Sequence, residues 1–274
     1  MLTPRQIIDA AIAEFKPVAI YAGYTGGGDS LALAHWMMTN VPDCKLFLVN
    51  TGVGIERARQ HVRDVCKDRN WPLVEIRSKE ECGQDYDALV LERGFPGPDH
   101  HKKMYDRLKG RAIGKLVRDS KKQRMDKVLI ASGIRHDESI IRMGYSGREI
   151  NRIGAQVWCN PIYWWTKEQR DEYIAKHDLP ISPISKALGM SGECGCGAYA
   201  QPGELKHWAA VDPEFGKRIE CLEQKVLERG FTWKWDGRPP KGGHNPQQID
   251  FITPLCGAGC LRSAVVQKEL DEAA

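Results

Sequence analysis

Residues 18–30, VAIYAGYTGGGDS, decide the fold of this chain. The apolar run at 18–22 is typical of a buried central strand. The three glycines at 26–28 accept positive φ and let a ligand approach the backbone closely. Asp29 and Ser30 then begin a helix that continues through LALAHWMMTN. Because a glycine turn at a helix N-terminus points backbone N–H groups and the positive end of the helix dipole at an anion, the stretch predicts a phosphate-binding loop.

Two familiar phosphate motifs do not fit this loop. The Walker A pattern requires Lys and then Ser or Thr after its last glycine, where this chain has Asp29. The dinucleotide fingerprint requires three spaced glycines, and these three are contiguous. Instead, TGGGDS resembles the SGGxDS signature of the ATP-pyrophosphatase (PP-loop) superfamily, with Thr25 retaining the hydroxyl of the first serine. For the glycines alone, a tight strand-to-helix turn without a ligand is the alternative.

The composition is that of an ordinary globular protein, with 274 residues, of which 42% are hydrophobic and 28% charged. This length suits one large domain, or one domain with an appendage, and it is enough to bury a real core. No apolar run reaches the length of a membrane span. The N-terminus, MLTPRQIIDAAIAEF, has acidic residues and predicts a short amphipathic helix rather than a signal peptide. We therefore expect a soluble, cytoplasmic chain with no membrane partner.

Strand and helix signals alternate along the chain. Alternation at these lengths predicts an α/β fold: a mainly parallel five-stranded sheet with helices on both faces, which is Rossmann-like. Ligands of such sheets bind beyond the carboxyl ends of the strands, where the glycine loop lies. After the strand at 18–22, the predicted strands are 45–50, 73–76, 128–131 and one within 157–162; the predicted helices include 55–70, 82–93, one capped by Thr166 and one beginning at Pro213.

A second glycine turn, NTGVGIE at 50–56, follows the second predicted strand and begins the second helix. Two adjacent strands that each end in a glycine turn could frame one nucleotide between them. The longer stretch NTGVGIERARQHVRDVC resembles the matching segment of the PAPS (phosphoadenylyl sulfate) reductase family. Over roughly residues 15–200, the chain is therefore identified as a member of this PAPS reductase-like family within the PP-loop superfamily. Three more stretches match in the family's order: HHKKMYDRLKGR at 100–111, SGIRHDES at 132–139 with Arg142, and PIYWWTKEQRDEYIAKHDLPIS at 161–182.

The resemblance implies an adenine-nucleotide site, with ATP as the expected ligand and PAPS or APS (adenylyl sulfate) as the alternative. Arg135 and Arg142 carry planar guanidinium forks that suit phosphate or sulfate oxygens, and Glu138 could hold one of them or assist a metal. A structural ion pair is the alternative for each. Asp29 could position Mg²⁺, which prefers carboxylate and phosphate oxygens. The predicted catalytic residues are Asp29, Ser30, Arg135 and Glu138; the predicted nucleotide-binding residues are Thr25, Gly26, Gly27, Gly28, Asp29, Ser30, Asn50, Thr51, Gly52, Gly54, Gly133, Arg135 and Arg142.

Positive charge is concentrated in one segment. Residues 100–127 hold eleven Lys or Arg against three Asp or Glu, a local net charge of +8, whereas the whole chain has a net charge of +4. A solvated helix face is the usual explanation of such a segment. The functional explanation is the binding of a polyanion, either a nucleotide with several phosphates or a nucleic acid such as tRNA or DNA.

Nine cysteines in a chain expected to be cytoplasmic argue against a disulfide framework. Two close pairs lie in glycine-rich turns, as CxC at 194–196 and CxxxC at 256–260, and together they could supply four thiolates to one metal centre. The family resemblance favours a 4Fe-4S cluster, with zinc as the alternative; redox-active or merely conformational cysteines are the remaining explanation. The predicted metal ligands are Cys194, Cys196, Cys256 and Cys260; Cys44, Cys66, Cys82, Cys159 and Cys221 are expected to be small core residues.

The two parts of the chain divide at residue 190: 1–190 is the expected adenine-nucleotide-binding domain, and 191–274 a cysteine-containing extension packed on it. The thioredoxin-dependent reductases of the family use a cysteine in a C-terminal ECGxxH tail, and the tail after Cys260 here has none. We therefore expect ATP-dependent (adenylating) sulfur transfer linked to the metal centre, as in the thiolation of tRNA bases. Reduction of an adenylyl sulfate, with Cys256 or Cys260 as nucleophile, is the first alternative. A non-catalytic nucleotide- or nucleic-acid-binding subunit is the second. Candidate partners are a nucleic-acid substrate, a sulfur-donor protein and a second copy of the chain.

Overall fold

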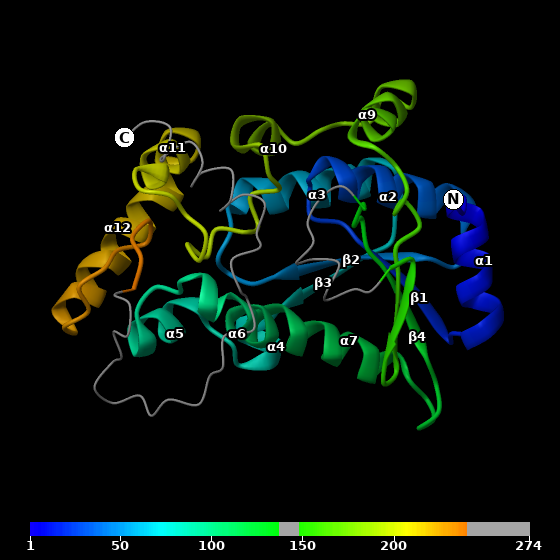
Figure 1. The fold of residues 1–274 in the computed structure, drawn as a ribbon, viewed down its shortest axis with the longest axis horizontal. Helices are drawn as coiled ribbons and strands as arrows, with labels where there is room; N and C mark the ends of the chain where they lie inside the picture. The colour runs from blue at the N-terminus through cyan, green and yellow to red at the C-terminus, as the bar shows by residue number, and fades with distance from the viewer. Residues whose placement is uncertain (137–147, 240–274) are drawn as a thin grey trace.

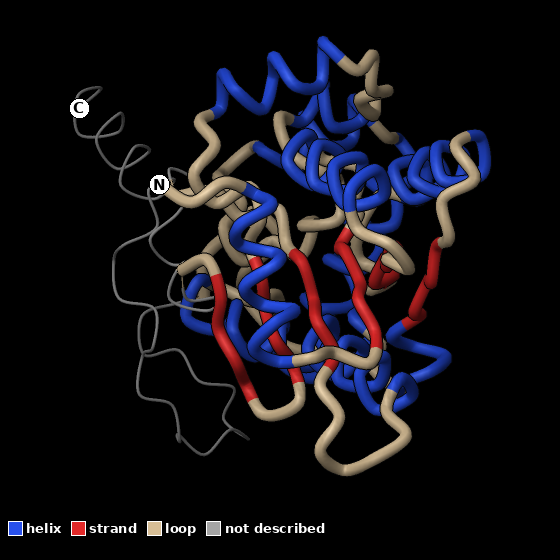
Figure 2. The backbone as a smooth tube through the Cα atoms, turned by 90° about the vertical axis from the view of Figure 1, so that its right-hand side faces the viewer, coloured by secondary structure: helices blue, strands red, loops and turns tan. Residues whose placement is uncertain are grey.

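The computed structural model describes residues 1–136 and 148–239. Its centre is a six-stranded sheet with the strand order β3-β2-β1-β4-β6-β5, which lies between helices (Figures 1 and 2). All neighbouring strands are parallel except β5 and β6, which are antiparallel. The expected α/β fold with a mainly parallel sheet is confirmed. The strands are β1 (Ala19–Gly23), β2 (Lys45–Asn50), β3 (Leu73–Arg77), β4 (Val128–Ala131), β5 (Ile150–Ile153) and β6 (Gln156–Cys159).

The prediction of five strands was wrong, because β5 is an additional edge strand. It pairs with β6 in a hairpin, with Ile150 opposite Cys159 and Ile153 opposite Gln156. Its sequence, INRI, has no buried residue and so lacks the apolar run that marked the other strands. An antiparallel edge strand needs only one neighbour and no second packed face, so periodicity alone could not reveal it.

The strand order reverses next to β1. The chain passes from β1 to β2 and β3 on one side and then returns to β4 on the other side of β1. Loops that leave β1 and β4 therefore emerge side by side at the carboxyl ends of the strands. In open α/β sheets this switch point is where ligands bind.

Two helical layers cover the two faces of the sheet, as expected. On β2, Leu46 and Leu48 face one core, whereas Phe47 and Val49 face the other. The first core is closed by α1 (Pro4–Phe15), α2 (Gly28–Asn40), α3 (Glu56–Asp68) and α9 (Lys167–Lys176). The second core is closed mainly by α7 (Arg111–Ser120). The predicted capping box of Thr166 with Gln169 forms at α9, and a second one, which was not predicted, joins Thr3 with Gln6 at α1.

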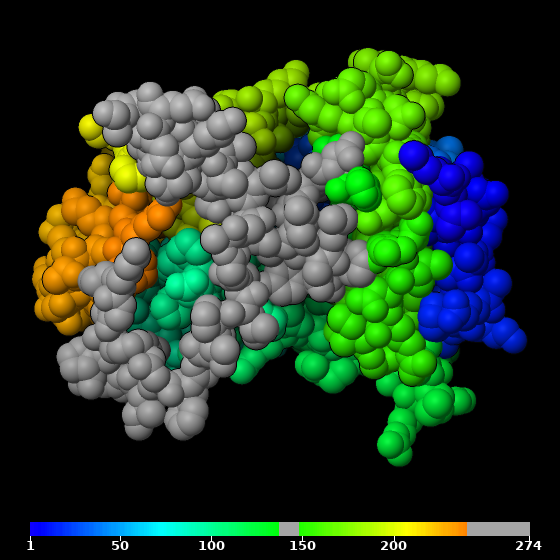
Figure 3. All heavy atoms as spheres, viewed as in Figure 1, coloured from blue at the N-terminus to red at the C-terminus, as the bar shows by residue number. Residues whose placement is uncertain are grey.

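A third apolar cluster lies at one end of the molecule, opposite α1 (Figures 1 and 3). At its centre Trp208, Phe215 and Trp235 pack with ring centroids 4.9–5.9 Å apart. The helix predicted over 82–93 begins later, at Tyr86, because Cys82 is the last residue of an earlier helix that ends at the left-handed Gly83. The short helix α4 (Ser78–Cys82) packs on α7, beside the second core. The remaining helices are α5 (Tyr86–Arg93), η1 (Pro98–His100), α6 (His101–Tyr105), the π-helical turn η2 (Asp106–Gly110), α10 (Pro183–Leu188), α11 (Glu204–Val211) and α12 (Pro213–Glu228).

The five single cysteines fall into two groups. Cys44, Cys66 and Cys159 are buried, as expected of core residues. Cys82 is half-buried and packs against the second core, whereas Cys221 is exposed, so the prediction was wrong for Cys221. Cys221 lies off the buried face of α12, which the apolar residues of the third cluster occupy. No helix in the described ranges is both long and apolar enough to cross a membrane.

Candidate functional site

The first glycine turn is closed by its own hydroxyl groups. Gly26 has a φ of +82°, which the turn requires, and Gly27 precedes the first residue of α2. The Ser30 hydroxyl donates to the Gly27 carbonyl oxygen (2.9 Å) and lies 3.2 Å from the Thr25 backbone nitrogen, which donates to it. The Thr25 hydroxyl also donates to Ser30 Oγ, at 3.3 Å. The hydroxyl retained at Thr25 therefore helps to shape the loop.

Asp29, in the first turn of α2, binds two arginines through one oxygen. Its Oδ1 accepts from Arg135 Nε at 2.6 Å and from Arg170 Nη1 at 3.0 Å. Arg135 is only 6% exposed, and its Nη1 is buried without a hydrogen-bond partner among the described residues. Gly133 allows this approach, because a Cβ there would lie 3.0 Å from the Asp29 carbonyl carbon and oxygen. Arg170 Nε also pairs with the half-exposed Asp171 at 2.7 Å. Two guanidinium groups thus lie at a helix N-terminus, an arrangement whose N–H donors suit an anion.

Arg170 is a site residue that the sequence did not predict. It lies on α9, with a side chain that is 13% exposed, and its Nη1 would be 2.9 Å from a Cβ at Gly28. Arg170 and Asp29 are 141 residues apart in the chain. Packing of α9 on α2 brings them together; His35 Nδ1 and the Tyr173 hydroxyl join the same two helices at 2.8 Å. The sequence around Arg170 contains no signal of this contact.

The second glycine turn, at 50–54, is shaped by its own side chains. Asn50 Oδ1 accepts from the Gly52 backbone N–H at 3.0 Å, and Thr51 Oγ1 accepts from the Val53 N–H at 3.3 Å. Gly52 has a φ of +70° and open space around its Cβ position. Gly54 differs, because a Cβ there would lie 2.5 Å from the Gly192 carbonyl oxygen. This turn is therefore in close contact with a segment from the C-terminal part of the chain.

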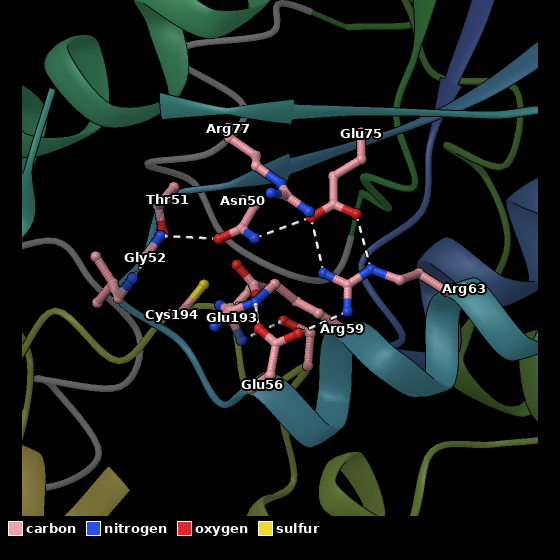
Figure 4. A network of polar contacts seen from close by, with 12 residues as sticks. Asn50, Thr51, Gly52, Glu56, Arg59, Arg63, Glu75, Arg77, Glu193 and Cys194 are labelled. Carbon is pink, nitrogen blue, oxygen red and sulfur yellow. Dashed lines mark hydrogen bonds and ion pairs between the residues drawn. The ribbon is translucent and has the colours of Figure 1, made fainter. Parts of the chain in front are cut away.

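A network of ion pairs supports the second turn (Figure 4). Arg63 binds Glu75 in a bidentate manner, at 2.7 and 2.8 Å, and Asn50 Nδ2 donates to the same carboxylate at 2.9 Å. These bonds, Arg63 first, lower the pKa of Glu75 to about 2. Arg59 Nη1 donates to Glu193 Oε1 at 2.9 Å, and both side chains are buried. Burial nevertheless raises the pKa of Glu193, although Arg59 opposes this effect.

The CxC turn, residues 191–197, lies against both glycine turns. Ser191 Cβ would be 3.3 Å from a Cβ at Gly27, and the Gly192 carbonyl oxygen accepts from the Ile55 N–H at 3.0 Å. Cys194 is exposed, with Lys109 Nζ 4.0 Å from its sulfur (Cys194 is labelled in Figure 4). Cys194 is also the main cause of the raised pKa of Lys109. The turn thus places a thiol beside the two glycine turns.

The other cysteine of this turn is more enclosed. Cys196 is half-buried, and burial raises the pKa of its thiol. The Cys196 carbonyl oxygen accepts from the Tyr86 hydroxyl at 2.9 Å, and the Gly195 carbonyl oxygen accepts from Trp235 Nε1 at 2.8 Å. The backbone of the turn is therefore anchored by the third apolar cluster, which fixes where both thiols lie.

Residues 19–191 match the family model described as the phosphoadenosine phosphosulfate reductase domain. The chain belongs to the phosphoadenosine phosphosulfate reductase family. The match begins at β1 and ends in the CxC turn, so it covers both glycine turns and Arg170. The expected membership of this family is confirmed.

This chain is similar to individual proteins over part of its sequence or in its fold. An adenosine 5′-phosphosulfate reductase from Deinococcus radiodurans is 40% identical over 52 residues, which is 19% of this chain and 20% of that protein. The solved phosphoadenylyl-sulfate reductase from Candida auris, a phosphate complex, has a TM-score of 0.50 and 17% identity, over 69% of this chain and 85% of that one. The U34-tRNA thiolase NcsA from Methanococcus maripaludis, solved with its 4Fe-4S cluster, has a TM-score of 0.39 and 14% identity, over 82% of this chain and 80% of that one.

Several predicted residues of this family member stay predictions. Glu138, Arg142, Cys256 and Cys260 lie outside the described residues. Over 1–136 and 148–239, no three or more His, Cys, Asp or Glu side chains gather so as to hold a metal ion. The described half of the predicted centre, Cys194 with Cys196, offers two thiols on one anchored turn. A metal centre with four thiolate ligands would require Cys256 and Cys260 to reach this turn as well.

Proposed function

We propose that this member of the phosphoadenosine phosphosulfate reductase family cleaves ATP between its α and β phosphates and transfers sulfur to the activated acceptor. The observation that carries the proposal is the contact of the CxC turn with both glycine turns. Ser191 lies against the Gly27 position and Gly192 binds Ile55, so the Cys194 thiol adjoins the nucleotide loops. Sulfur chemistry and nucleotide chemistry would then share one site.

The glycine loop supplies the groups that ATP cleavage needs. An acceptor oxygen attacks the α phosphorus, a new O–P bond forms, and the bond to the bridging oxygen breaks, so that pyrophosphate leaves with the electron pair. The N-terminus of α2, the unpaired Nη1 of Arg135 and the guanidinium of Arg170 are placed to stabilise the negative charge that pyrophosphate gains. Mg²⁺, with Asp29 as a candidate ligand, would share this charge.

The second step replaces the adenylated oxygen by sulfur. A sulfur nucleophile attacks the atom that bears the adenylated oxygen; a bond to sulfur forms, the bond to oxygen breaks, and AMP leaves with the electron pair. A sulfur-donor protein is the expected source of that sulfur. A 4Fe-4S cluster, if held by Cys194, Cys196, Cys256 and Cys260, would supply a site that binds and presents sulfur. Lys109, beside Cys194, adds a positive charge that favours an anionic sulfur species there.

Product analysis tests the proposal. The full chain is incubated with ATP and Mg²⁺ or with PAPS or APS, with nucleic acid as acceptor, and both pyrophosphate and sulfite are measured. We expect pyrophosphate from ATP, its loss in Asp29→Ala, and wild-type release in the control Asp119→Ala, which changes an exposed carboxylate on α7. Sulfite from PAPS or APS without pyrophosphate from ATP would refute ATP-dependent transfer.

Reduction of a sulfonucleotide is the second candidate, favoured by the 52-residue match to an adenosine 5′-phosphosulfate reductase. A thiolate would attack the sulfur, forming an S–S bond as the S–O bond to the nucleotide breaks. A second thiol would then attack the thiolate's sulfur, so that sulfite leaves with the electron pair and the two thiols become a disulfide. Cys256 or Cys260 is the candidate nucleophile. A non-catalytic nucleotide- or nucleic-acid-binding subunit predicts binding without either product, and tolerance of Asp29→Ala.

A further inference from the structure

A small pocket between α5 and α6 collects three basic side chains. Arg93, Lys103 and Arg107 line it together with the apolar side chains of Phe95 and Met104. None of the glycine-loop, second-turn or CxC residues contributes to its lining. Part of this segment, coloured teal, reaches the surface in Figure 3. The pocket is therefore a feature separate from the nucleotide site.

The helix places like charges together in this pocket. Lys103 and Arg107 are four residues apart, the spacing at which side chains on a helix meet and like charges repel. The same segment uses this spacing for attraction elsewhere, since Lys102 pairs with Asp106 and Lys115 with Asp119. Neither pocket residue has such a partner: within the described ranges, the side chains of Lys103 and Arg107 make no hydrogen bond or ion pair.

Arg93 adds a third positive charge from a different element. It pairs with Glu92, whose side chain is 58% exposed, through Nε at 3.1 Å and Nη2 at 2.9 Å. The three cations and this one carboxylate together leave a net charge of +2. Burial, followed by the charges of Arg93 and Arg107, lowers the pKa of Lys103. The three neighbouring cations create a positive electrostatic potential in the pocket, and a bound anion would be stabilised by it. Arg107 also belongs to the π-helical turn η2, a rare geometry that is frequent at functional sites.

We propose that Arg93, Lys103 and Arg107 bind the phosphate of a phosphate ester. Two guanidinium forks and one ammonium provide directional donors and charge, and the apolar walls exclude water from one side. The backbone of a nucleic acid is the source that the charge favours, because residues 100–127 carry a local net charge of +8. A free phosphorylated metabolite has the same chemistry. The site does not depend on the reaction proposed for the glycine loop.

A double variant with a matched control tests the site. In the full chain, Lys103→Gln with Arg107→Gln is compared with Lys122→Gln with Arg124→Gln, which removes the same charge from the exposed residues after α7. Binding of a fluorescein-labelled single-stranded 12-mer, as RNA and as DNA, is followed by anisotropy at several salt concentrations. We expect about tenfold weaker binding for the pocket variant, at most about twofold for the control, and a salt slope reduced by about 1.4 for two lost phosphate contacts.

Stability separates loss of the site from loss of the fold. Because the pocket charges repel each other, the pocket variant is expected to unfold at a temperature equal to or above that of the wild type. A second titration uses ribose 5-phosphate, which lacks the adenine that the glycine loop would recognise. If the pocket variant loses binding of ribose 5-phosphate but keeps binding of the 12-mer, the phosphate site is supported and its ligand is a free metabolite. Equal weakening in both double variants, or no weakening of either ligand, would overturn the proposal.

Discussion

The carboxylate of Glu75 should make the fold sensitive to acid in a defined range of pH. Glu75 lies on β3, is 16% exposed, and binds Arg63 through both oxygens and Asn50 through one. These contacts lower its pKa from 4.5 to about 2. A carboxyl whose folded pKa is depressed stabilises the folded state above its unfolded pKa, and this stabilisation is lost as pH falls through the folded pKa.

The magnitude follows from the two pKa values of Glu75. A fall from 4.5 to about 2 corresponds to about 3 kcal/mol of stability at pH 7. About 1.4 kcal/mol of this is lost by pH 3.5, and the rest on further acidification towards pH 2. Glu75→Gln removes the titrating group, so the difference in free energy of unfolding between wild type and variant should shrink by that amount between pH 7 and pH 3.5.

Urea unfolding at pH 7, 5 and 3.5 measures this difference. Asp119→Asn is the control, because it changes a carboxylate in an exposed pair with Lys115 and should keep the acid sensitivity of the wild type. The reasoning fails if the difference between wild type and Glu75→Gln stays constant over this range, or if it is below about 1 kcal/mol at pH 7. Glu75→Gln should also affect the second glycine turn, because the Glu75 carboxylate accepts from Asn50 Nδ2 and the Oδ1 of the same Asn50 accepts from the Gly52 backbone N–H.

Two further predictions concern the site itself. Arg170→Gln should weaken ATP binding about tenfold to a hundredfold, which is the value of one charge-assisted contact, while Asp29 stays paired with Arg135. Calorimetric titration measures the affinity for ATP, and an unchanged affinity would exclude Arg170 from the phosphate site. Gly54→Ala should destabilise the fold by about 2 kcal/mol and weaken nucleotide binding, because the added Cβ would meet the carbonyl oxygen of Gly192. Gly52→Ala has free space for its Cβ and should cost only about 1 kcal/mol, for its positive φ. Equal shifts of the thermal unfolding temperature in the two variants would contradict this prediction.

The glycine loop shows how far local sequence reasoning reaches. Its strand, turn and helix were all predictable, because each depends on a short stretch: apolar residues for β1, a glycine at positive φ, and an acidic first turn for α2. The same holds for the capping box at Thr166 and for the start of α12 after its N-cap, Asp212. Such signals involve residues within four positions of each other, and the chain carries them whatever it packs against.

The network around Glu193 could not be predicted in this way. The CxC next to Glu193 predicts a metal turn, but no local signal indicates that the Glu193 side chain is buried against Arg59, 134 residues earlier in the chain. Edge strand β5 was missed for a related reason, since its pairing depends on a neighbour rather than on its own residues. In both cases the structure is stabilised by a contact between two elements, and that contact forms only when the elements meet in the folded chain.

The sequence by itself determined the family, the parallel sheet and the two glycine turns, because periodicity, glycine conformation and motif order are properties of neighbouring residues. Only the tertiary structure decided that Arg170 joins Arg135 on Asp29, and that the CxC turn lies on the glycine turns. Those contacts span more than a hundred residues of chain. They form because the strand order reverses at β1 and brings the loops of separate strands to one edge of the sheet.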